Sequence, residues 1–170
     1  MKLKFTEIAV FGMLGSLMYA SKVLMEAFPN VHLIGVFVVA ITVVYRVKAL
    51  YPIYVFVLLT GLFAGFSAWW IPYLYIWTVL WGVIMLLPKK VHPVVYILCC
   101  GLHGLLYGTL YAPAQAILFG LSFKGMLAWI AAGFAFDCIH GLSNLCCGLL
   151  IVPLIKIMQA AQRKIGTLSV

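Results

Sequence analysis

The sequence predicts an all-α integral membrane protein, a bundle of six transmembrane helices, on three observations. Of its 170 residues, 66% are hydrophobic and 8% are charged, too few polar side chains to coat a soluble globule of this size. The mean hydropathy is +1.20. Residues 49–88 contain no charged side chain. Because a bilayer core of about 30 Å needs roughly 20 apolar residues per helix, that block alone has room for two spans.

The apolar runs in the rest of the chain are also long enough for membrane helices, so we expect residues 1–170 to form a single transmembrane domain. The expected helices cover about 5–27, 33–47, 50–67, 71–88, 92–113 and 125–155. We place the break in the uncharged block at Ser67 to Pro72, "SAWWIP". The second and third helices are short for full spans, which is compatible with tilt, a thin bilayer contact or burial by neighbouring helices.

The basic residues predict the orientation of these spans. Nine of the eleven Lys and Arg residues fall on one side of the six-span arrangement: Lys2, Lys4, Arg46, Lys48, Lys89, Lys90, Lys156, Arg163 and Lys164. Lys22 and Lys124 do not fit. Since cytoplasmic loops are enriched in basic residues, we expect a multi-pass membrane protein with both termini in the cytoplasm. This topology explains the net charge of +8, and no nucleic-acid partner is required.

The start of the chain, "MKLK" before an apolar run, imitates a secretory signal peptide. Glu7 interrupts the start, the run is long, and a small-residue cleavage site is missing. We therefore expect the first helix to remain as a membrane span.

Motifs for metal binding and energy conversion are absent from the sequence. Its five cysteines, in the adjacent pairs Cys99-Cys100 and Cys146-Cys147 plus Cys138, form no C-x-x-C, and neighbouring helical residues point about 100° apart. We expect no metal and no disulfide. There is also no G-x-x-x-x-G-K-[ST] phosphate loop, so active transport would need ATP used by another chain.

The segment "GFAFDCIHGLSN", residues 133–144, contains Asp137, one of three acidic residues in the chain. Asp137, His140 and Asn144 are spaced i, i+3 and i+7, on one face of the last helix. An ionised Asp in the middle of a membrane helix costs roughly 2.5–3.5 kcal/mol on insertion scales. Such a residue faces a bundle interior or a polar cavity, either as an interhelical hydrogen-bond knot or in ligand or proton handling.

Two further helices carry aromatic and polar side chains at helical spacing. Tyr96, His103 and Tyr107 share one face of the fifth helix, and Trp70, Tyr73, Trp77 and Trp81 follow the fourth. Some of the fourth helix's aromatic residues belong to the membrane-interface belt. Trp77 and Trp81 lie too deep for that, so they either pack in the bundle or line a cavity for a flat ligand.

Two other segments are candidate contact regions. The connection "MEAFPNVH" carries Glu26, Asn30 and His32 at the predicted extracytoplasmic mouth, either as an ordinary solvated turn or as the rim of a pocket. In the first helix, Gly12, Ser16 and Ala20 form a strip of small residues that lets two helices approach closely in lipid, the partner being either another helix of this chain or another subunit.

With six spans, cytoplasmic termini and this small-residue strip, the chain resembles the substrate-binding S components of energy-coupling-factor (ECF) transporters of the ABC type. The resemblance includes "PNVHLIGVFVVAITVVY" (29–45), the Trp-rich "WTVLWG" (77–82) and "FDCIHGLSN" (136–144), which is similar to the F-D-x-I-H-x-x-x-N segment of that group. It implies a subunit that captures a vitamin or related micronutrient. That subunit docks on a membrane coupling subunit bound to two cytoplasmic ATPases.

The resemblance also implies roles for residues. Gly12, Ser16 and Ala20 match the coupling-subunit contact, although family members often have Ala where this chain has Gly and Ser. The family's ligand sites lie in the outer half of the bundle, under the loop after the first helix. The expected substrate-binding residues are Glu26, Asn30, His32, Trp70, Tyr73, Trp77, His103, Tyr107, Asp137, His140 and Asn144.

The Trp and His residues favour a flat heteroaromatic substrate, of cobalamin or queuosine-precursor type; riboflavin, thiamine, folate and biotin are also compatible with them. One rival reading is an intramembrane enzyme that uses Asp137 and His140 as an acid–base pair, with His103. The sequence places no nucleophile at a recognisable spacing from these residues, so we expect no catalytic residue. The other rival is a structural subunit whose polar residues only hold helices together.

Overall fold

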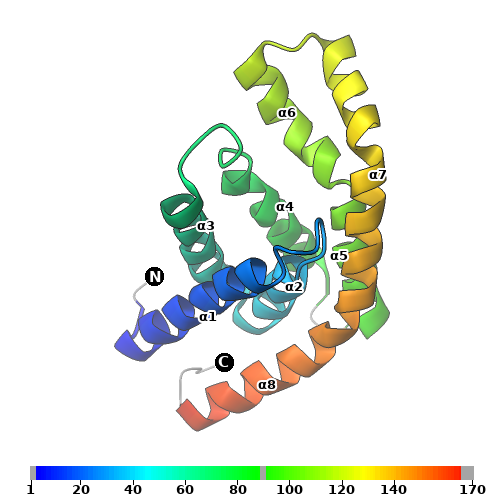
Figure 1. Cartoon of the computed structure of the whole chain (residues 1–170). Helices are drawn as coiled ribbons and strands as arrows, with labels where there is room; N and C mark the ends of the chain where they lie inside the picture. The colour runs from blue at the N-terminus through cyan, green and yellow to red at the C-terminus, as the bar shows by residue number, and fades with distance from the viewer. Residues whose placement is uncertain (1–2, 89–90, 166–170) are drawn as a thin grey trace.

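A computed structural model describes residues 3–88 and 91–165, and every regular element in these ranges is a helix (Figure 1). The α-helices are α1 (Phe5–Leu24), α2 (Ile34–Tyr45), α3 (Leu50–Ala64), α4 (Tyr73–Leu86), α5 (Pro93–Leu105), α6 (Tyr107–Phe119), α7 (Phe123–Cys147) and α8 (Ile151–Ile165). Two 3₁₀ segments, η1 (Arg46–Ala49) and η2 (Gly148–Leu150), join α2 to α3 and α7 to α8.

Within the described ranges, four helical stretches are long and apolar enough to cross a membrane: Phe5–Leu24, Ile34–Ala64, Pro93–Phe119 and Phe123–Lys164. The helix Tyr73–Leu86 is apolar and shorter. The predicted all-helical chain, compatible with a membrane bundle, is thereby confirmed.

The helix boundaries differ from the expected ones in two places. The helix expected at 92–113 is interrupted at Leu106, whose φ and ψ of −97° and 6° depart from helical values, and α6 continues to Phe119. The helix expected at 125–155 continues through η2 into α8, which ends at Ile165. Its charged residues Lys156, Arg163 and Lys164 are exposed while Met158 is buried, so α8 is amphipathic and its charges do not end it.

Helix α2 forms the centre of the molecule. Every residue from Ile34 to Thr42 is buried, and α2 packs chiefly against α4 and α8, with α5 and α1 also in contact. A helix that is apolar on all sides is stable only where neighbours cover all of them. Neighbouring helices therefore cover α2 on all sides.

Polar contacts join three elements at one end of the bundle. Glu7, on the first turn of α1, is 3% exposed and forms an ion pair with Lys48 of η1. Arg46 donates to the carbonyl of Met85 at 3.0 Å, and the indole of Trp81 donates to the carbonyl of Arg46 at 3.1 Å. These contacts hold the first turn of α1 and the last turn of α4 against η1, the side where α8 also ends (Figure 1).

Glycines bring α5 and α7 into backbone contact. A Cβ on Gly104 would lie 2.8 Å from the carbonyl oxygen of His140 and 3.0 Å from the Cα of Gly141. One on Gly141 would lie 3.1 Å from the backbone nitrogen of Leu105. Small residues at such crossings allow the close packing that drives helix association in lipid. The crossing also sets the spacing of His103 and His140, the neighbours of two of these glycines.

Candidate functional site

Five aromatic side chains from five segments form what we call the ring cluster: His32, Trp77, His103, Tyr107 and His140. His32 belongs to the connection 25–33, and the others to α4, α5, α6 and α7. The ring centroids of His32 and His140 are 4.5 Å apart, and those of Tyr107 and His140 are 4.7 Å apart. Trp77 is central, at 5.9 Å from His32, 5.7 Å from His103 and 5.8 Å from Tyr107.

More aromatic rings extend the cluster on both sides. Tyr73 and Phe56 lie 5.8 Å and 6.0 Å from Trp77. Tyr111 lies 6.0 Å from Tyr107 and stacks on Trp129 of α7. Sequence reasoning missed Phe56, Tyr111 and Trp129. For Tyr111 a signal was present, since it follows Tyr107 by one helical turn.

The ring cluster contains polar atoms that have no partner in the structure. The buried nitrogens His32 Nδ1, Trp77 Nε1, His103 Nδ1 and His140 Nε2 make no hydrogen bond to any of the residues that the structure describes. Trp77, His103 and His140 are 1%, 6% and 3% exposed. A buried donor or acceptor without a partner costs about 1–3 kcal/mol, and most such groups in proteins are satisfied. Four of them in one cluster make it the candidate site for a polar ligand or ordered water.

His32 is the one member of the ring cluster that comes from the connection between α1 and α2. Its ring is buried against His140 and Trp77, although other atoms of the residue are partly exposed. Burial lowers the pKa of His32 from 6.5 to about 4, because the charged imidazolium would lose its hydration. The side chain is therefore neutral at neutral pH.

Asp137 lies outside the ring cluster and stabilises the start of α6. It is 6% exposed, and its Oδ1 accepts a hydrogen bond of 2.9 Å from the backbone N–H of Gly108. Because Leu106 interrupts the helix, the first N–H groups of α6 need partners from elsewhere, and a carboxylate suits a helix N-terminus. A side chain on residue 108 would collide with this carboxylate, which accounts for glycine there. The bond places Tyr107, the preceding residue, against His140.

Asn144 and Trp70, both expected at the site, make structural contacts instead. Asn144 is fully buried and donates through Nδ2 to the carbonyl of Cys100 at 3.1 Å, which ties α7 to α5, while its Oδ1 has no partner among the described residues. Trp70 donates through Nε1 to the carbonyl of Val57 at 2.8 Å and so attaches the connection 65–72 to α3. Neither belongs to the ring cluster.

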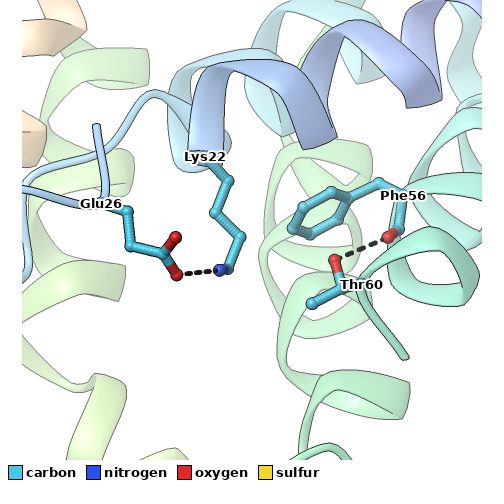
Figure 2. Close-up of polar contacts among 4 residues, drawn as sticks. All are labelled: Lys22, Glu26, Phe56 and Thr60. Atoms are coloured by element: carbon cyan, nitrogen blue, oxygen red, sulfur yellow. Dashed lines mark hydrogen bonds and ion pairs between the residues drawn. The ribbon is translucent and has the colours of Figure 1, made fainter. Parts of the chain in front are cut away.

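Glu26 and Asn30, the other expected rim residues, lie in the connection 25–33. Glu26 forms an ion pair of 3.4 Å with Lys22, one turn earlier. Figure 2 shows this pair beneath the end of α1, with the ring of Phe56 pointing toward it from α3. Asn30 has a φ of 61°, a left-handed conformation that Asn tolerates in turns. Of the three rim residues, His32 alone enters the ring cluster.

The small-residue strip of α1 lies in an open groove between α1 and α8. The groove has a volume of about 960 Å³, and Gly12, Ser16 and Ala20 line it together with Ile157 and Ala161. A Cβ on Gly12 would meet nothing within 4 Å. The first helix packs against α3 through a different glycine, residue 15, so the strip itself is left without a partner helix from the described residues.

No family model matches the chain, and neither the curated proteins nor the solved structures compared with it give a match. Among the residues described, no group of three or more His, Cys, Asp or Glu side chains is arranged to hold a metal ion, and all five cysteines are free.

Proposed function

We propose that this chain is the substrate-binding S component of an ECF-type transporter that takes up a vitamin or related micronutrient. The observation that supports this most is the ring cluster, in which four buried nitrogens of contacting aromatic side chains have no hydrogen-bond partner among the described residues. Ligand pockets combine largely apolar walls with a few placed polar groups in this way. A cobalamin-type or queuosine-precursor-type compound would supply a flat heteroaromatic group that can contact these rings.

The proposed topology has six spans with both termini in the cytoplasm of a bacterial-type cell membrane. The ion pair between Glu7 and Lys48 supports it, because it joins the start of the first span to the connection after the second. Lys2, Lys89 and Lys90, which contribute to the charge argument, lie outside the described residues. In this orientation the connection 25–33 faces outward, above the ring cluster.

The proposed partners are a membrane coupling subunit and two cytoplasmic ATPases, which would use ATP. The groove between α1 and α8 supports a helical partner, since Gly12, Ser16 and Ala20 leave room for a helix backbone to approach. The chain itself has no phosphate-binding motif, so transport against a gradient would depend on such partners.

The enzyme alternative loses support from the geometry of Asp137. Its carboxylate accepts from Gly108, and the described residues contain no hydrogen bond between Asp137 and His140. A general acid–base pair would need the two groups within hydrogen-bond reach of each other or of a shared substrate.

The test is affinity purification of the tagged chain from its native membranes in mild detergent, with co-purifying proteins identified by mass spectrometry. We expect one membrane coupling subunit and two ATPases. The matched control is Ser16→Leu, which should lose these partners while the chain itself is still recovered. Purification of the wild-type chain alone from several detergents would contradict the proposal.

A further inference from the structure

The unpartnered atoms of Trp77 and His103 have fixed hydrogen-bonding roles. An indole N–H can only donate. His103 Nε2 lies 3.1 Å from the carbonyl of Ile76, and a carbonyl can only accept, so Nε2 carries the proton. Nδ1 of His103 is therefore an acceptor. The two rings lie side by side, with centroids 5.7 Å apart. One molecule that satisfies both must accept from Trp77 and donate to His103.

The other two unpartnered nitrogens add groups whose hydrogen-bonding role can change. His32 Nδ1 and His140 Nε2 can each donate or accept, depending on which ring nitrogen is protonated. Their rings are 4.5 Å apart in an edge-to-face arrangement. Tyr107 lies between the two pairs, 4.7 Å from His140 and 5.8 Å from Trp77. The ring planes of neighbouring members are tilted by 38° to 81°, so a ligand would meet aromatic faces and edges together with polar groups from more than one side.

The surroundings of the ring cluster disfavour a charged ring system. In the described part of the chain, no Lys, Arg, Asp or Glu forms a hydrogen bond or an ion pair with any of the five rings. Lys22 and Glu26 are near enough to act on His32 and Tyr73, but they form an ion pair with each other at 3.4 Å. The nearest carboxylate along α7, Asp137, is occupied by Gly108. A buried charge without a partner costs far more than a neutral group that makes its hydrogen bonds.

We infer that the substrate carries an uncharged, planar nitrogen heterocycle of the lactam type, with a carbonyl acceptor beside an N–H donor on one edge. The carbonyl accepts from Trp77 Nε1 and the N–H donates to His103 Nδ1. This inference rests on the proposed substrate-binding role and narrows it, because it excludes substrates recognised through a cationic ring such as thiazolium.

The test uses the purified full chain in detergent and calorimetric titration with three neutral lactams: pterin, 7-deazaguanine and lumichrome. Each is paired with an N-methylated counterpart that lacks the lactam N–H, and thiamine serves as the cationic probe. We expect at least one lactam to bind, its N-methylated counterpart to bind about tenfold or more weakly, and thiamine not to bind.

A pair of variants locates the binding. Trp77→Phe keeps an aromatic ring but removes the donor, so we expect it to weaken lactam binding about tenfold or more. Trp81→Phe is the matched control on the same helix, because the Trp81 indole donates to Arg46 and lies outside the ring cluster. It should leave the affinity unchanged. The N-methylation comparison needs no variant, so it holds even if Trp77→Phe fails to fold.

Binding of thiamine in preference to the lactams, failure of all three lactams to bind, or equal effects of the two Trp variants would each overturn the inference. Failure of this inference can be distinguished from failure of the proposed function. A coupling module recovered with a chain that ignores lactams contradicts the substrate class alone. Trp77-dependent lactam binding by a chain that purifies without partners contradicts the transporter alone.

Discussion

At the scale of single residues, Asp137 is a carboxylate within a long apolar helix, and its partner is a backbone group of another helix. Its Oδ1 satisfies the backbone N–H of Gly108 at the start of α6. We expect Asp137→Leu to lower the free energy of unfolding by about 1–3 kcal/mol, because it leaves that N–H buried without an acceptor. Asp137→Asn, whose amide oxygen can still accept, should lose much less. Thermal unfolding in detergent measures both.

The control for this pair is Cys138→Ser, an exposed position on the same helix, which should unfold like the wild type. Equal stability of the Leu and Asn variants would mean that the bond to Gly108 contributes nothing.

His32 makes the stability of the folded chain depend on pH. Its pKa is about 4 in the folded protein, against 6.5 for an ordinary histidine, because its ring is buried. Between these values the unfolded chain takes up a proton that the folded chain does not. The contribution is therefore complete above about pH 6.5 and is lost as the pH falls toward 4, by at most about 1.4 kcal/mol per pH unit.

We expect His32→Gln to flatten this part of the curve when melting temperature is measured from pH 7.5 to 4. His92→Gln, which changes an exposed histidine, should keep the wild-type slope. Identical slopes for wild type and His32→Gln would show that His32 is protonated equally in both states.

At the scale of elements, the crossing of α5 and α7 positions two of the three histidines of the ring cluster. A Cβ on Gly104 would lie 2.7 Å from Asn144 Nδ2 and 2.8 Å from the carbonyl oxygen of His140. We expect Gly104→Ala to cost about 1–3 kcal/mol of stability, since backbone atoms must move apart, and to weaken substrate binding as well. The measurements are thermal unfolding and ligand titration.

Gly133→Ala is the matched control, also within a helix, with nothing within 4 Å of the added Cβ. Because alanine favours the helix over glycine, it should be neutral or slightly stabilising. A Gly104→Ala protein as stable as this control would contradict the close crossing.

The observed helices also show which predictions from the sequence are correct and which contacts could not be predicted. Hydropathy was sufficient to predict an all-helical chain, because buried and lipid-facing helices are both apolar. Periodicity placed Trp77, His103 and His140 on helix faces, and these residues do meet. It could not separate them from Asp137 or Asn144, because partners such as Gly108 and Cys100 come from other helices. The interruption at Leu106, and with it the need for Asp137, left no mark in composition.

At the scale of the whole molecule, two surfaces with different chemistry are built from different helices. The ring cluster draws on α4 to α7 and the connection 25–33, whereas the groove draws mainly on α1 and α8, with Tyr45 of α2 (Figure 1). No residue belongs to both. The central helix α2 packs against elements from each group, so it is the physical link between them. Because the two share no residue, we expect a change confined to the groove to leave the affinity for the proposed substrate intact.

The variant Ser16→Leu tests in a transport assay whether the groove and the ring cluster are independent. Ser16 is exposed in the groove, so a leucine there can be accommodated by the chain alone but would obstruct a helix that packs against Gly12, Ser16 and Ala20. We expect coupled uptake of substrate in cells to be abolished while binding to the purified protein stays near normal. Val23→Leu, an exposed change on α1 outside the groove, should leave both unchanged. Unchanged uptake with Ser16→Leu would remove the groove as the docking surface, and loss of binding together with uptake would mean that the two surfaces are not independent.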